Sequence, residues 1–127
     1  MVMQRWLSGG LGAMAAGNGV MMLVDGQHWY ATIPGVSETG PFNPHFVADI
    51  GAAFLIAGLA LAARAWRPQY WPAAFAGAGF LCAHGLIHVL DILGGHSHHA
   101  GFETLSVVLP SVLALWASLP AKGEGYV

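Results

Sequence analysis

The sequence predicts an all-α protein, an integral membrane four-helix bundle with a long structured loop between its first two helices. Hydrophobic residues make up 56% of the 127 residues and charged residues only 8%, with a mean hydropathy of +0.60. A soluble domain carries about 25% charged residues, so this chain lacks the material for a solvated surface. Four apolar stretches also reach the roughly 20 residues that a helix needs to cross a bilayer. We therefore expect residues 1–127 to form a single transmembrane domain in a lipid bilayer.

The first predicted span covers residues 6–24 and is rich in glycine and alanine. Its apolar core would also fit a signal peptide, but we expect it to be a membrane helix. Small residues let helices approach each other closely in lipid, so we expect these glycines to serve packing. Asn18 is an amide within an apolar segment and needs a polar partner, which predicts that it faces the interior of the bundle.

The loop over residues 26–43 is long for so small a protein. Pro34, Gly35, Gly40 and Pro41 are turn signals within it. A simple joint between two helices needs fewer residues than this. We therefore expect the loop to fold over one end of the bundle as a cap.

The remaining predicted spans cover residues 44–65, 72–93 and 101–119. The second span has a clear start, because Asn43 is a favourable N-cap and Pro44 suits the first helical position. Pro110 lies in the middle of the fourth span and predicts a kink there.

The distribution of basic residues predicts the orientation in the membrane. The chain has four of them, Arg5, Arg64, Arg67 and Lys122, and all flank the same ends of the predicted spans. The positive-inside rule makes that side cytoplasmic, with both termini there. A net charge of -2 with so few basic residues provides no basic surface for binding nucleic acid.

Acidic residues and histidines gather at the opposite ends of the spans. His84, His88 and Asp91 follow a spacing of four and then three, which predicts that they share one face of the third helix. His45 and Asp49 are four apart and share a face of the second helix. Intramembrane ionisable groups cost about 2.5–3.5 kcal/mol each, so we expect these groups to be paired or to bind a metal.

Imidazole and carboxylate side chains together predict a site for a transition metal, namely copper, zinc or iron. Helical bundles hold such sites between facing helices. The predicted metal residues are His45, Asp49, His84, His88, Asp91 and Glu103, of which Asp49 and Glu103 are ligands or groups that orient a ligating histidine. A metal-free polar or proton-relay network is the main alternative, and haem is another. Haem fits less well, because two histidines on one helix cannot bind opposite faces of a porphyrin.

The predicted function is that of a metal-binding protein of the bacterial inner membrane, with a His/carboxylate site near the periplasmic face, beneath the periplasmic loop. The sequence leaves three alternatives open. A metal-dependent redox or hydrolytic enzyme would keep one metal position open beneath the loop, where Trp29 and Tyr30 exclude water and Glu38 acts as the catalytic base. A metal-handling protein would take its ion from the "HSHH" tract of His96, His98 and His99. An accessory subunit of a larger membrane complex, or a homo-oligomer, would need only the polar network.

Two short motifs in the first half of the chain suggest a family. The stretch "WYATIPGV", followed by "TGPFNPHFVADIG", resembles bacterial four-helix membrane proteins of the DoxX-like kind. The resemblance covers roughly residues 10–60. It implies a four-helix membrane bundle and assigns no roles to individual residues.

Overall fold

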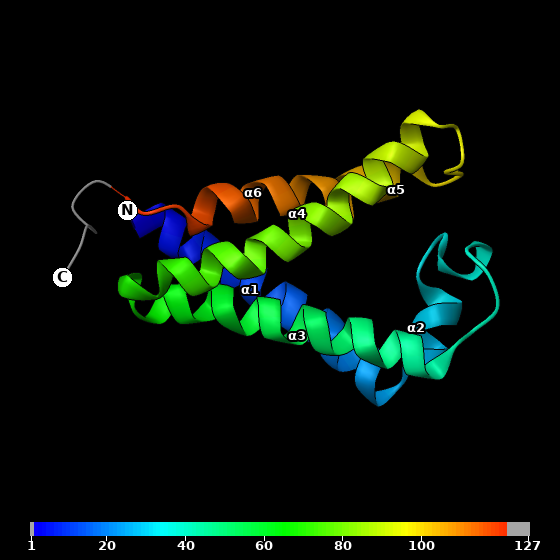
Figure 1. Cartoon of the computed structure of the whole chain (residues 1–127), viewed down its shortest axis with the longest axis horizontal. Helices are drawn as coiled ribbons and strands as arrows, with labels where there is room; N and C mark the ends of the chain where they lie inside the picture. Colours follow the sequence, from blue (N-terminus) through cyan, green and yellow to red (C-terminus); the bar gives the residue numbers. More distant parts are fainter. Residues whose placement is uncertain (1, 122–127) are drawn as a thin grey trace.

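The computed structural model describes residues 2–121, and helices account for most of them (Figure 1). No strand occurs within this range, so the all-α prediction is confirmed. Four helical rods are long and apolar enough to cross a membrane. They are α1 (Val2–Val24), α3 (Pro44–Trp66), α4 (Trp71–Leu93) and a composite rod of α5 (Ala100–Glu103), η3 (Thr104–Val108) and α6 (Leu109–Ser118).

The long helices begin and end at residues whose caps, turns or backbone angles fix these boundaries. Asn43 caps α3 by accepting a hydrogen bond from the backbone N–H of Phe46 at 3.1 Å, and Pro44 follows at the first helical position. A short 3-10 turn, η2 (Pro68–Tyr70), reverses the chain into α4. At the other end of α4 the chain leaves the helix through Gly94 and Gly95, and the positive φ of 73° at Gly95 suits glycine.

The composite rod is irregular just before Pro110. Proline has no N–H to donate to the carbonyl of Ser106, four residues earlier. The turn η3 is π-helical, a form in which the backbone is wider than in an α-helix. The irregularity expected at Pro110 is therefore a π-helical turn on its N-terminal side.

The tightest helix contact joins α1 to α3 through glycines. A Cβ atom added to Gly12 would lie 2.6 Å from the carbonyl oxygen of Gly58, and one added to Gly19 would lie 2.5 Å from that of Gly51. Only hydrogen fits at such separations, so the two backbones touch directly. These glycines serve packing, as small residues do between helices in lipid.

One end of the bundle holds the N-terminus of α1 and the C-terminus of α6, and we refer to it as the terminal end (Figure 1). Arg64 is fully buried there, and its Nε donates to the carbonyl oxygen of Ala117 at 2.8 Å. Arg5 donates to the carbonyl oxygen of Ala65 at 2.9 Å. Both guanidinium groups thus satisfy carbonyls at helix C-termini, where a positive charge is favourable. Lys122 lies outside the described residues.

At the opposite end, which we refer to as the loop end, the pair α1 and α3 diverges from the pair α4 and α6 (Figure 1). Two connections lie there, residues 25–43 between α1 and α3, and residues 94–99 between α4 and α5. The first connection contains the helix α2 (Gly26–Thr32) and the turn η1 (Val36–Glu38). It folds back until Gly35 approaches His99, with 3.4 Å between a Cβ added to the glycine and the Cδ2 atom of His99.

Candidate functional site

A cavity of about 320 Å³ lies between the four rods and reaches the loop end. Most of its wall is apolar. Its polar lining residues come from three of the rods: Asn18, His84, His88, Glu103, Ser106 and Ser111. A mainly apolar cavity with a few convergent polar groups is the usual form of a small-molecule site.

The roof of the cavity comes from the connection between α1 and α3, through residues that include Trp29, Pro34 and Val36. The indole Nε1 of Trp29 donates to the Oδ1 atom of Asn18 at 2.9 Å. This bond ties the roof to α1 and gives Asn18 the interior partner that its burial requires. Of the two aromatic residues expected in the roof, Trp29 lines the cavity, whereas Tyr30 packs on Phe42 with 5.3 Å between the ring centroids.

His84 projects from α4 into an aromatic part of the wall. Its ring lies edge-on to Phe54, with 5.3 Å between the centroids, and 4.8 Å from the ring of His88. Within residues 2–121 neither of its ring nitrogens has a hydrogen-bond partner, although the side chain lines the cavity. His84 therefore has hydrogen-bonding capacity to offer a bound molecule.

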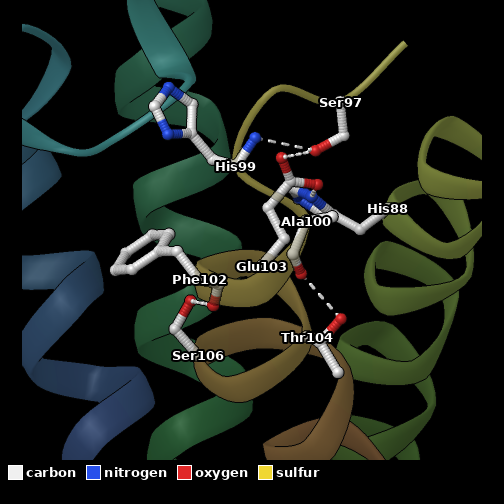
Figure 2. Close-up of polar contacts among 8 residues, drawn as sticks. All are labelled: His88, Ser97, His99, Ala100, Phe102, Glu103, Thr104 and Ser106. Atoms are coloured by element: carbon white, nitrogen blue, oxygen red, sulfur yellow. Dashed lines mark hydrogen bonds and ion pairs between the residues drawn. The ribbon is translucent and has the colours of Figure 1, made fainter. Parts of the chain in front are cut away.

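His88, one turn further along α4, belongs to a network with the α4–α5 connection (Figure 2). Its Nδ1 atom lies 2.8 Å from Oε2 of Glu103, which is buried at the end of α5. The other carboxyl oxygen of Glu103 accepts from the hydroxyl of Ser97 at 2.6 Å. The Ser97 oxygen in turn accepts from the backbone N–H of His99 at 3.2 Å.

With Glu103 ionised, the hydrogen-bond partners in this network assign the positions of the protons. The Ser97 oxygen accepts a hydrogen bond from the backbone N–H of His99, so its own hydroxyl hydrogen points to Glu103. The Oε1 atom of Glu103 accepts that hydrogen. An ionised carboxylate only accepts, so its second oxygen takes a hydrogen from Nδ1 of His88. The Nε2 atom of a neutral His88 then carries a lone pair. Within the described residues Nε2 has no partner, and His88 lines the cavity.

A second contact joins the two connections at the loop end. The Nε2 atom of His99 lies 3.0 Å from Oε1 of Glu38, and both side chains are partly exposed to solvent, that of Glu38 by 49%. Glu38 was predicted to be a catalytic base beneath the loop. It does not line the cavity, and its carboxylate instead joins η1 to the α4–α5 connection.

The other predicted metal residues lie elsewhere. His45 and Asp49 contact each other at 3.4 Å, but their side chains are 89% and 63% exposed. Asp91 is exposed as well, near the C-terminus of α4. Within residues 2–121, no three His, Cys, Asp or Glu side chains form a group that could hold a metal ion. His45 and Asp49 of α3 therefore do not join His84, His88 and Asp91 of α4 in one metal-holding group, because their side chains are exposed on the outside of α3.

Two members of the network, Ser97 and His99, are not predicted from the sequence. Ser97 and His99 belong to the "HSHH" tract, for which the sequence predicts only a role in taking up a metal ion. His96 and His98 of the same tract are exposed. The signal that could have separated them is the hydroxyl of Ser97, a residue type that bonds to nearby backbone and carboxylate groups in turns.

Comparisons with known proteins add nothing to this description, since no protein-family model, no curated protein and no solved structure matches the chain.

Proposed function

We propose that the chain is an integral membrane protein that binds a small hydroxyl-bearing organic molecule in the loop-end cavity, with His88 as the general base for that hydroxyl. The observation that carries the proposal is the His88–Glu103 contact of 2.8 Å on the cavity wall. It leaves the lone pair of Nε2 available to accept a hydrogen from the ligand.

The same arrangement allows proton exchange. A ligand O–H that donates to Nε2 of His88 can pass its proton to the imidazole, and the ring becomes a cation. The carboxylate of Glu103, already bonded to Nδ1, stabilises that cation and holds the ring in one orientation. Return of the proton regenerates the neutral ring, so the residues support reversible deprotonation of the bound hydroxyl.

Other lining residues favour a ligand whose hydroxyl is attached to an aromatic ring, that is, a phenol. Trp29, Phe54 and Phe102 all contribute to the wall, and aromatic side chains pack well against a planar ring. His84, beside His88, is available to donate a hydrogen to the phenol oxygen once the proton has left it. An ionised phenol would thus be held between two imidazoles.

The membrane placement rests on the four long apolar rods and on the basic residues. Arg5 and Arg64 lie at the terminal end, whereas Glu38 and Glu103 lie at the loop end. With the basic end cytoplasmic by the positive-inside rule, the cavity lies near the periplasmic face of a bacterial inner membrane.

An organic ligand suits this cavity better than the metal or haem expected from sequence spacing. Of the six predicted metal residues, only His84, His88 and Glu103 line the cavity, and the structure does not arrange them as a metal-holding group. A metal is the competing result of the experiment below.

The test is calorimetric titration of 4-ethylphenol into the untagged protein in lipid nanodiscs, with the metal content of each sample measured in parallel. We expect one saturable site per chain and about tenfold weaker binding in His88→Leu. His45→Leu is the matched control, because this histidine is exposed and does not line the cavity, and it should bind like the wild type. Absence of saturable binding, or a stoichiometric metal that His88→Leu removes, would overturn the proposal.

A further inference from the structure

We infer that the ligand is a membrane-dissolved phenol with a long apolar tail, which enters the cavity sideways through the seam between α1 and the α5–η3 segment. The inference rests on the proposed function and names the class of ligand for the same site. The ring would occupy the cavity near His88, and the tail would lie in the seam.

The size of the cavity limits what it encloses. Ligand sites commonly measure about 300–1,000 Å³, and the volume here, about 320 Å³, is at the lower limit. Such a space accommodates a single ring with small substituents. A longer ligand must leave part of itself outside, so the position of the opening decides which ligands fit.

The exposed lining residues locate that opening. Met14 of α1 is 51% exposed and Phe102 of α5 is 41% exposed, and Ser106 of η3 is exposed beside them. On the opposite wall, Phe54 of α3 is half-buried and Leu81 of α4 is buried. The cavity therefore reaches the molecular surface on the flank of the bundle, between α1 and the composite rod.

The roof is a less suitable entrance. Pro34 is exposed there, but residues before and after it in the chain are bonded to other parts of the bundle and keep the roof in place. Trp29 is bonded to Asn18 of α1, and Glu38 is bonded to His99 of the α4–α5 connection. Entry from the loop end would have to break both contacts, whereas entry through the seam breaks neither.

The surface of the seam is compatible with lipid. Thr104 and Ser106 expose hydroxyl groups there, and a hydroxyl is costly in hydrocarbon unless it forms a hydrogen bond. The hydroxyl of Ser106 donates to the carbonyl of Phe102 at 2.6 Å, and that of Thr104 donates to the carbonyl of Ala100 at 2.7 Å (Figure 2). With these groups satisfied, Met14 and Phe102 present apolar side chains to a hydrocarbon tail, and methionine adapts its shape to what it contacts.

The test compares two radiolabelled phenols, 4-ethylphenol and 4-dodecylphenol, binding to nanodisc-embedded protein in which the seam is blocked. Ser106→Trp places a bulky ring at the opening, and Met14→Trp does so from the other side. Leu105→Trp is the matched control, because Leu105 is 69% exposed in the same turn but does not line the cavity. Each variant is compared with the wild type for the same ligand, so partitioning into the lipid cancels.

Because Met14 and Ser106 line the cavity, both blocking variants should weaken binding of either phenol. We expect them to weaken binding of 4-dodecylphenol about tenfold more than binding of 4-ethylphenol, and the control to bind both normally. Equal effects on the two ligands, or failure of the wild type to bind the long-tailed phenol while it binds the short one, would overturn the seam inference alone. Failure of the wild type to bind either phenol would overturn the proposed function with it.

Discussion

The two ends of the bundle solve the same problem in different ways. Each end holds ionisable side chains within apolar helices, which is costly unless the charges find partners. At the terminal end, the guanidinium of Arg64 is fully buried and bonded to backbone carbonyls of α6 and the residue that follows it. At the loop end, Nδ1 of His88 is bonded to Glu103. The Nε2 atom of His88 stays available for a ligand in the cavity that this residue lines.

This difference separates a structural role from a functional one. A buried group that donates to backbone carbonyls, as Arg64 does, holds helices together. A group held in one orientation by its neighbours, with one polar atom left toward a cavity, contributes less to folding and more to binding. Substitutions at the terminal end should therefore act on stability, and those at the loop end on ligand binding.

The largest effect on stability is expected from Arg64→Leu. The change leaves the carbonyl oxygens of Ala117 and Leu119 without their charged donor, at a cost of about 3 kcal/mol. SDS titration of the protein in mixed micelles measures this loss as the free energy of unfolding. Arg67→Leu is the control, because Arg67 is exposed, and it should unfold almost like the wild type. Equal stability of Arg64→Leu and the wild type would remove the distinction between the two ends.

The second largest loss in the free energy of unfolding is expected when a methyl group is added at the α1–α3 contact, which lies along the helices that join the two ends. In Gly58→Ala the new methyl group would meet the carbonyl oxygen of Gly12 at 2.5 Å, so the helices must separate, at a cost of roughly 1–3 kcal/mol. The same unfolding titration applies. Gly10→Ala serves as the control, since a Cβ there meets nothing within 4 Å. If the two alanine variants unfold alike, the close backbone contact does not exist.

At the loop end, Glu103→Gln should affect binding more than stability. The amide keeps the shape of the side chain but lacks the charge that stabilises a protonated His88. We expect the free energy of unfolding to change by about 1 kcal/mol and 4-ethylphenol to bind about tenfold more weakly. A variant that unfolds easily and still binds the phenol normally would reverse the roles assigned to the two ends.

The smallest effect belongs to Glu38→Gln. Its contact with His99 is partly exposed, and exposed ion pairs contribute about 0.2–1 kcal/mol. Both stability and 4-ethylphenol binding, measured by the same two methods, should remain near wild-type values. Loss of binding in this variant would instead support the catalytic role that the sequence predicts for Glu38.

The helices were predictable because their boundaries depend on local chemistry. Asn43 and Pro44 start α3 by capping and by a fixed φ angle, and both effects act within one turn. The stripe formed by His84 and His88 was predictable for the same reason, since helical spacing alone puts them on one face. The sequence predicts Glu103 as a metal ligand or as a group that orients a histidine, and the structure pairs it with His88.

The rotation of α3 was not predictable. Apolar residues surround this helix on every side, so no stripe indicates which face points inward. Spacing shows that His45 and Asp49 share a face, but the direction of that face follows from the close contact of Gly51 and Gly58 with α1. The path of the loop that carries Trp29 and Glu38 could not be predicted from the sequence either, because it depends on contacts with residues distant in sequence.

The central claim, that the loop end holds His88 with a lone pair ready for a ligand, is tested most directly by nitrogen-15 NMR of the protein labelled in its histidine rings. The chain has seven histidines, and the spectrum of His88→Gln identifies the signals of His88. We predict that Nδ1 carries the proton and that Nε2 is unprotonated, with the Nε2 signal moving when 4-ethylphenol is added. A proton on Nε2 in the free protein, or an Nε2 signal that saturating phenol leaves unchanged, would contradict the account.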